Sequence, residues 1–410
     1  MQRNPLTLTR WVLLWAILGI VCGLFASSYW IILVGMIQVL EQSNGLSLLF
    51  VMPLAGFLIG LAIKRLGNPG EIGLIIDNIH LNQGRLATRE NPAMILSSLI
   101  SIASGGSAGP EAPMVQVTGS LGTWFADRFH LQGEALRSLS IAGMASGFTV
   151  LFGAPLGGTF FALEILHHQH VVEYYEAIVP AIVASCASYT IFAAITKLGI
   201  GPTWHFPQYH LDNIGDFAQA MLYGIVGAVV GWFFITVFRW CARLFEVLPG
   251  PIYFQTTLAG LGLGILAVLF PLTRYFGEHQ LAEIVEGNFN VSFLLGLALA
   301  KILAICITVT GGWRGGIIIP LFFTGACLGK AIAAVYPELN AVLAMICLMA
   351  SLNVTVTRTP ISTTLLLSKL TGFGTFTPIL FASMVGFFLA PRVPFIASQL
   401  KAGNSTKEID

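Results

Sequence analysis

The sequence predicts an all-α, polytopic membrane protein made of two related halves. Three observations predict this class: an apolar composition, a long succession of apolar segments, and motifs that recur across the midpoint of the chain. Of the 410 residues, 56% are hydrophobic and 10% are charged. Soluble domains are about 25% charged, so this chain has too few charged side chains to cover a water-exposed surface of its size.

The charge balance argues against nucleic acid as a partner. The formal net charge is +1 and no basic run exceeds two residues, whereas binding to a phosphate backbone needs a basic face. The six cysteines lie in apolar stretches without metal-ligand spacing, so we expect reduced thiols that pack as small hydrophobic side chains. We therefore expect neither a metal nor a cofactor.

The first apolar segment, residues 11–39, is longer than the core of a signal peptide, which spans about 7–15 residues. We expect it to remain in the protein as a membrane helix. Arg3 and Arg10 precede it, and Lys64 and Arg65 follow the second segment. Two crossings return the chain to the same side, so both basic clusters can be cytoplasmic, as the positive-inside rule expects. We expect a multi-pass protein of the plasma (inner) membrane with both termini in the cytoplasm.

Apolar segments follow one another to the end of the chain, and several are too short to span a bilayer. A spanning helix needs about 20 apolar residues to cross about 30 Å of hydrocarbon. The twelve residues at 93–104 would reach only about 18 Å as a helix. Such short segments indicate helices that stop inside the membrane, where non-helical backbone is tolerated only if protein or water surrounds it. In order, the segments are 11–39, 46–63, 93–104, 114–126, 136–151, 156–166, 178–198, 217–245, 256–270, 293–310, 317–335, 341–352, 361–370 and 377–400.

Two motifs recur in the same order in the second half of the chain. MASGFTVLFGAP at 144–155 recurs as MASLNVTVTRTP at 349–360, which is 205 residues later. The set Gly105, Gly109 and Pro113 recurs 207 residues later as Gly312, Gly316 and Pro320. We therefore predict two membrane repeats, 1–205 and 206–400, followed by a short polar tail, 401–410. Paired short segments in two halves indicate a transport site at the membrane midplane.

Glu111 lies in the glycine-rich stretch GGSAGPEAPMVQ at 105–116, directly after the short segment 93–104. Pro110 or Pro113 suits the first turn of a new helix, and a helix N-terminus binds anions through its unpaired N–H groups. An ionised Glu111 can take the place of such an anion, and a protonated Glu111 can leave it. A carboxylate within the membrane costs about 2.5 kcal/mol or more, so we predict that Glu111 is a protonatable gate. The alternative is a glutamate that only caps the helix.

The stretch GWRGGIIIP at 312–320 is a second glycine-rich break before a helix. Its residues 317–319 are apolar, so only backbone N–H groups can contact an anion there. We predict that the helix starts after 105–110 and 311–316, one from each half, bind one anion between them.

These motifs resemble those of the CLC chloride channel and transporter family. GPEAPMVQ at 109–116 resembles the gating-glutamate motif of that family, G(K/R)EGP followed by a glutamine. GIIIP at 316–320 resembles its GxFxP motif, and APLGGTFFALE at 154–164 resembles its APLAG…E helix. The resemblance covers most of the chain in the right order. It implies two inverted-topology repeats of broken and tilted helices, a homodimer with one pore per subunit, and transport of chloride or a similar small anion.

The resemblance also implies roles for individual residues. It makes Glu111 the external gating glutamate, and it places Ile165 where many exchangers have an internal proton-transfer glutamate. Gly70 stands in place of a serine of the family's GSGIP loop, and Ile396 in place of a tyrosine near the C-terminus. Both hydroxyls that normally contact the central anion are therefore absent. The implied anion-binding set is Gly70, Gly109, Pro110, Gly316, Ile317, Ile318 and Ile396.

The transport mechanism and the anion stay open at this point. Glu111 favours exchange of an anion for protons, whereas an apolar residue at Ile165 is typical of a channel. The fluoride-transporting branch of the family also departs at the two hydroxyl positions. We therefore favour anion/proton exchange, with a passive voltage- or pH-gated chloride channel and a fluoride/proton antiporter as alternatives.

Three further features each have two interpretations. Glu164 is either a structural carboxylate at a helix end, which we favour, or a proton relay. Lys301 precedes the second break and would raise the local anion potential, although snorkelling or a helix-end position explains most such residues. The stretch GLGLG at 260–264 lacks the strand–turn–helix context of a dinucleotide site, so we expect it to pack one helix against another.

One enzyme interpretation competes with transport. GGSAG at 105–109 matches the G-x-S-x-G pattern of serine hydrolases, in which Ser107 would be the nucleophile. That pattern indicates a hydrolase only where a strand turns sharply into a helix and a histidine lies nearby. Here both flanking segments are predicted helices. We therefore expect transport and no enzymatic activity.

Overall fold

The computed structural model describes residues 5–69, 84–166, 171–198, 203–207, 209, 213–396 and 399. Within these residues the regular elements are α-helices and three short 3-10 helices, and no strand is present. The α-helices are α1 (Pro5–Leu40), α2 (Leu48–Leu66), α4 (Asn91–Ala103), α5 (Glu111–Arg128), α6 (Glu134–Phe152), α7 (Pro155–Glu164), α8 (Val171–Thr196), α9 (Gly215–Val247), α10 (Ile252–Leu269), α11 (Glu278–Glu286), α12 (Val291–Thr310), α13 (Ile318–Val335), α14 (Ala341–Thr357), α15 (Pro360–Thr371) and α16 (Phe376–Phe388). The 3-10 helices are η1 (Gly45–Ser47), η2 (Pro271–Thr273) and η3 (Phe373–Thr375).

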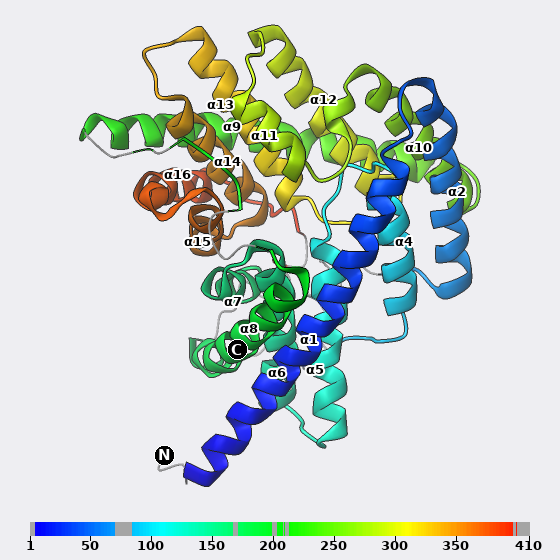
Figure 1. Ribbon diagram of the computed structural model, residues 1–410, viewed down its shortest axis with the longest axis vertical. Helices are drawn as coiled ribbons and strands as arrows, with labels where there is room; N and C mark the ends of the chain where they lie inside the picture. Colours follow the sequence, from blue (N-terminus) through cyan, green and yellow to red (C-terminus); the bar gives the residue numbers. More distant parts are fainter. Residues whose placement is uncertain are drawn as a thin grey trace, which may run out of the picture.

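Eight helices in the described part of the chain are long and apolar enough to cross a membrane. They are α1, α2, α6, α8, α9, α10, α12 and α13, with η1 extending α2. The first of them, α1, runs obliquely along most of the length of the molecule (Figure 1). Shorter apolar helices such as α4, α14 and α16 lie among them. The predicted all-α membrane architecture is confirmed.

Two helices form the centre of the packing. Helix α6 packs against α5, α7 and α8, and α14 packs against α9, α13 and α16. Every residue of α14 from 342 to 357 is buried. Because other helices cover α14 on all sides, no face of it meets solvent, and nearly all of its side chains are apolar. Its few polar side chains form hydrogen bonds to backbone groups. The Ser351 hydroxyl, for example, donates to the Gly224 carbonyl of α9 at 2.5 Å.

The predicted segments and the observed helices differ most in two places. The segment predicted at 377–400 is too long, since α16 ends at Phe388 and the chain at 389–396 is irregular. Pro391 and Pro394 explain the break, because proline has no N–H to donate within a helix. Helix α11 was missed because its sequence, EHQLAEIVE, is amphipathic rather than apolar. The division of the chain near residue 205 stays a prediction.

Glycines bring α2 and α10 into close contact. A Cβ at Gly56 of α2 would overlap the Thr256 carbonyl of α10, and a Cβ at Gly260 of α10 would overlap the Met52 carbonyl of α2. Glycine within a helix costs about 0.5–1 kcal/mol relative to alanine. At these positions that cost is accepted because only glycine lets the two helix backbones approach so closely. The expectation that GLGLG at 260–264 packs helices together is confirmed.

This contact predicts opposite effects for two neighbouring glycines of α10. Gly260→Ala should destabilise the protein by about 1–3 kcal/mol, because the added methyl forces the backbones apart. Gly262→Ala should be neutral or stabilising, because its Cβ would meet only Ile307 side-chain atoms at 3.8 Å and alanine favours the helix. Thermal unfolding in detergent measures both, and equal behaviour of the two variants would contradict the close contact.

Candidate functional site

The chain turns back inside the protein after α4. This helix has 13 residues, which span only about 20 Å, and it is followed by Gly105 with φ of +104°. Such a left-handed conformation is available to glycine without steric cost. All residues from 105 to 113 are buried, so this stretch is no surface loop. Helix α5 then begins at Glu111.

Backbone hydrogen bonds join this first break to the second one, between α12 and α13. The Gly109 N–H donates to the Gly316 carbonyl at 2.8 Å, and the Gly316 N–H donates to the Gly109 carbonyl at 2.6 Å. The Ser107 N–H donates to the Thr308 hydroxyl of α12 at 3.1 Å. These bonds hold the N-termini of α5 and α13 next to each other.

The carboxylate of Glu111 lies where these two N-termini meet. The residue is completely buried, and its Oε1 accepts a hydrogen bond from the Ile319 N–H at 2.9 Å. The amides of Ile318 and of Glu111 itself also face the carboxylate. Each helix N-terminus carries roughly half a positive charge, so both stabilise the same anionic group. Its second oxygen, Oε2, is buried without a hydrogen-bond partner in the described part of the chain.

Two glycines form the walls around this carboxylate. A Cβ at Gly109 or at Gly316 would overlap Glu111 Oε2. Any larger residue would therefore displace the carboxylate from the space between the helix ends. The space that Glu111 fills depends on these two residues having no side chain.

Side-chain hydrogen bonds to neighbouring helices fix the second break. Asn353 of α14 donates through Nδ2 to the Ile318 carbonyl at 2.8 Å, and Trp313 donates through Nε1 to the Thr256 carbonyl at 2.9 Å. Both residues are buried, at 0% and 1% exposure. Neither was predicted as a site residue, because both lie between the predicted apolar segments, Trp313 after 293–310 and Asn353 directly after 341–352. They keep the first turn of α13 in place behind Glu111.

Most of the predicted anion-binding residues lie at this meeting point. Pro110 is the N-cap of α5 and Ile317 is the N-cap of α13, so both lie beside Gly109, Gly316 and Ile318. Ile396 is partly buried and packs against the main apolar cluster of the protein, which extends far beyond this meeting point. Gly70 lies outside the described residues.

Glu164 lies at a different place and caps a helix. It ends α7, and its carboxylate accepts from the Ile361 N–H at 3.0 Å and from the Ser362 N–H at 2.7 Å. The Ser362 hydroxyl donates to it as well, at 2.5 Å. These donors belong to the first turn of α15, so the geometry agrees with a structural carboxylate. The next residue, Ile165, is buried, and its carbonyl accepts from Gln399 Nε2 at 3.2 Å.

Ser107 lacks the surroundings of a hydrolytic nucleophile. It is buried between α4 and α5, so no strand precedes it. Its hydroxyl has no hydrogen-bond partner in the described residues, whereas a nucleophilic serine needs a base within hydrogen-bond reach.

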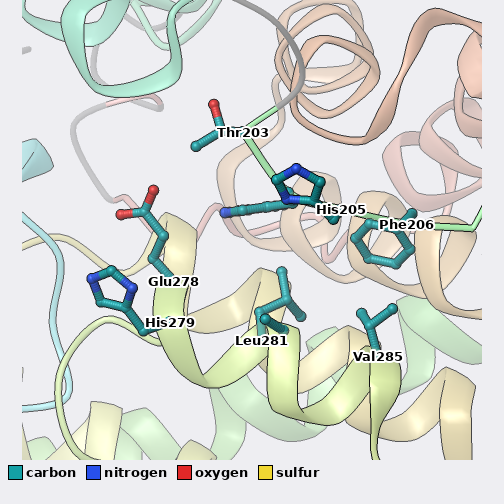
Figure 2. Close-up of a pocket in the computed structure, with 9 residues that line it drawn as sticks. Thr203, His205, Phe206, Glu278, His279, Leu281 and Val285 are labelled. Carbon is teal, nitrogen blue, oxygen red and sulfur yellow. The ribbon is translucent and has the colours of Figure 1, made fainter. Parts of the chain in front are cut away.

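A cavity of about 320 Å³ lies elsewhere, between residues 203–206 and α11. Figure 2 shows Glu278 and His279 at the start of α11, with His205 and Phe206 across the cavity from this helix. Burial raises the pKa of the Glu278 carboxyl, and the neighbouring His279 lowers it in part. The residues that line the cavity include none of the predicted site residues, so the cavity is separate from the Glu111 site.

Comparisons with known proteins give the family and the fold of this chain. A sequence model of the family described as voltage gated chloride channel matches residues 55–391. A chloride/fluoride channel protein of Pseudomonas syringae pv. tomato is 28% identical over 299 residues, covering 70% of this chain and 64% of that protein. The crystal structure of a CLC-type fluoride/proton antiporter superposes with a TM-score of 0.85 at 22% identity, over 97% of this chain and 99% of the other. That of a slow cyanobacterial Cl⁻/H⁺ antiporter gives 0.84 at 20% identity, with the same coverage. Both structures share the fold of this chain.

The glycine walls predict a coupling between two positions. Gly109→Ala should destabilise the protein by about 1–3 kcal/mol, because the three atoms nearest to its new Cβ all belong to the Glu111 carboxylate. In a Glu111→Ala background these atoms are absent, so the same substitution should cost much less. Thermal unfolding of the two single variants and the double variant measures the coupling.

Gly35→Ala is the matched control for this cycle, because a Cβ at Gly35 of α1 would meet nothing within 4 Å. It should be neutral or stabilising in both backgrounds. If Gly109→Ala costs the same with and without the carboxylate, the overlap is not the cause of the destabilisation.

Proposed function

Because this chain belongs to the voltage gated chloride channel family, and is therefore an anion-transport protein of the membrane, we propose that it exchanges an anion for protons with Glu111 as the gate. One observation carries the proposal. The buried Glu111 carboxylate accepts a hydrogen bond from Ile319 at the point where the N-termini of α5 and α13 meet. A site that binds a carboxylate through backbone N–H groups can bind an inorganic anion through the same groups.

The gate works by competition for these donors. While Glu111 is ionised, its carboxylate occupies the Ile319 N–H and excludes the anion. Protonation removes the charge that the two helix ends stabilise, so the side chain loses its attraction and can leave. The anion then takes the vacated place. Each return of the ionised side chain releases a proton, which links proton movement to anion movement.

We propose that backbone groups rather than hydroxyls bind the anion. The anion would lie among Gly109, Pro110, Gly316, Ile317 and Ile318, with Gly70 and Ile396 completing the path. The donors would be the N–H groups at the start of α13 that face Glu111, those of Ile318 and Ile319, because the N–H groups of Gly109 and Gly316 are bonded to each other's carbonyls and Pro110 has none. The described members of this set offer no side-chain hydroxyl. Chloride and fluoride are the two candidate anions, supported by the names of the similar proteins, which include a chloride/fluoride channel, a fluoride/proton antiporter and a Cl⁻/H⁺ antiporter.

A passive channel is the second candidate function, and one residue favours it. Ile165 cannot carry a proton, and the adjacent Glu164 directs its carboxylate at the first turn of α15. An exchanger would therefore need a proton route from Glu111 to the other side of the membrane that uses neither position.

We also propose a homodimer in the plasma membrane with both termini in the cytoplasm. The family resemblance supports the dimer. The orientation is supported by Arg10 near the start of α1 and by Lys64 and Arg65 in the last turn of α2, which two successive crossings place on the same side.

Glu111→Gln should abolish the pH dependence of anion flux. Glutamine keeps the size of the side chain but cannot ionise, so the occupant of the site no longer changes with pH. Flux through the unmodified protein should rise as the pH falls, by up to about tenfold per pH unit if one group titrates. Flux assays in liposomes at several pH values measure this.

Ser107→Ala is the control for that experiment, because it removes a hydroxyl close to Glu111 in the sequence and leaves Glu111 intact. Its flux and pH dependence should match those of the unmodified protein. A variant Glu111→Gln that retains the full pH dependence would remove Glu111 from its role as gate.

An exchanger can use an anion gradient to drive protons against their own gradient, whereas a channel cannot. If the protein exchanges, an anion gradient across liposomes should drive protons uphill. Running the assay with chloride and then with fluoride identifies the anion. Measurable anion flux without uphill proton movement would make the protein a channel.

A further inference from the structure

Two cysteine thiols from distant parts of the chain meet between α9 and α12 and play no part in the mechanism above. Cys241 lies in the last part of α9 and Cys306 in the second half of α12, and the two helices pack against each other. The two thiols are hydrogen-bonded to each other. Both side chains also contact one apolar cluster, in which Cys306 is buried and Cys241 is partly buried. We call these two residues the thiol pair.

The other cysteines have different surroundings. The structure describes all six cysteines, and all are free thiols. Cys22 donates to the Thr118 carbonyl at 3.8 Å, and Cys347 donates to the Pro378 carbonyl at 3.7 Å. Such contacts are typical of a thiol that packs as a small hydrophobic side chain. The thiol pair differs because each sulfur has a second sulfur as its neighbour.

Cys241 lies near the membrane surface. Arg239 and Arg243 flank it in α9 and are both exposed, and such side chains keep their charge at the membrane–water interface. The chain continues from α9 into α10, where the Tyr253 ring centroid lies 5.1 Å from the Lys64 ammonium of α2. Cys241 is therefore on the same side as Lys64, which is cytoplasmic in the proposed orientation. Thiols are kept reduced in the cytoplasm, and the disulfides that form there are usually transient and often sense oxidants.

Cys306 lies close to the residues that join the two breaks. It precedes Thr308 by two residues on α12, and the Thr308 hydroxyl accepts from the Ser107 N–H at 3.1 Å. The Thr310 hydroxyl donates to the Cys306 carbonyl at 2.7 Å. Ile317, the N-cap of α13, packs against the cluster that contains Cys306. A shift of α12 at Cys306 therefore moves residues that contact the first break and the start of α13.

Hydrogen peroxide can convert such a pair of thiols into a disulfide. The sulfur of the partly exposed Cys241 attacks one peroxide oxygen, the O–O bond breaks, and a sulfenic acid and one water form. The Cys306 sulfur then attacks the Cys241 sulfur, the S–O bond breaks, and the S–S bond forms with release of a second water. The two thiols supply the two electrons and two protons that reduce the peroxide. Exchange with a small dithiol, which is itself oxidised to a disulfide, restores both thiols.

We propose that Cys241 and Cys306 are a redox modification site, whose reversible oxidation to a disulfide by a peroxide slows anion transport. A covalent bond brings two sulfurs closer together than a hydrogen bond does, so the disulfide draws α9 and α12 toward each other. Because α12 carries Thr308, this movement displaces the first break relative to the start of α13. The inference holds for an exchanger and for a channel alike. The alternative is that the two thiols only fill space between the helices.

Peroxide treatment of the full-length protein in liposomes tests the proposal. After treatment with hydrogen peroxide, mass spectrometry of the digested protein without reducing agent should find the Cys241 and Cys306 peptides joined by a disulfide. Anion flux should fall about fivefold or more, which is the lower end of typical coupling between two sites. Dithiothreitol should remove the link and restore the flux.

Variants with one sulfur removed are the controls. Cys241→Ser and Cys306→Ser cannot form the link, so peroxide should leave their flux unchanged. Cys186→Ser removes the exposed thiol of α8 and keeps the thiol pair, so it should respond to peroxide as the unmodified protein does. Cys241 is only partly buried, so its serine variant should fold even if Cys306→Ser does not, and it is sufficient for the comparison.

Three results would each overturn the inference. The first is that no joined peptides form in the folded, peroxide-treated protein. The second is that the link forms and the flux stays the same. The third is that peroxide lowers the flux of Cys241→Ser as much as that of the unmodified protein, which would assign the effect to other residues.

Discussion

The rest of the structure depends on how two interrupted helices satisfy the first N–H groups of α5 and α13. These groups have no partner within their own helices, and an apolar interior offers no water to replace one. Gly109 and Gly316 hold the two helix starts together through a reciprocal pair of backbone hydrogen bonds, and Glu111 supplies the carboxylate that accepts from Ile319. These donors stabilise the Glu111 carboxylate, and in the proposed mechanism the same donors bind the anion when the side chain leaves. This double use would account for a charged residue at the centre of an apolar protein.

The surrounding helices restrict how far this site can move. Thr308 of α12 accepts from the first break, and Asn353 of α14 donates to the start of α13. Because α14 is buried along nearly its whole length, the second helix start is attached to one of the two helices at the centre of the packing. In the proposed mechanism the Glu111 side chain therefore moves and the backbone that holds it does not. A gate of this kind would need only a side-chain rotation.

Three charged residues, of which Glu111 and Lys301 are fully buried and Glu164 is partly buried, show that a charge inside this protein has more than one use. Glu164 completes the first turn of α15, and Lys301 bonds to carbonyls of the irregular chain after η2. Both side chains form hydrogen bonds to backbone groups that have no partner within a helix. Glu111 differs because two helix ends from distant parts of the chain face one carboxylate, and because Oε2 is left without a partner in the described residues. The number of converging helix ends, rather than burial alone, distinguishes the candidate site from the structural carboxylate.

The sequence alone determined the helical class, the positions of most helices, both breaks and the choice of Glu111. These features follow from local patterns, since apolar runs, glycines and prolines act within a few residues of themselves. Where local patterns conflicted, prediction failed: the segment at 377–400 ran past the prolines that end α16, and the amphipathic α11 was missed. Only the tertiary structure decided that Gly109 bonds to Gly316, that Ile319 donates to Glu111, and that Asn353 and Arg274 lie beside the two breaks. The residues in these contacts are 35 to 208 positions apart in the sequence, and the contacts are set by the packing of helices, which no local pattern specifies.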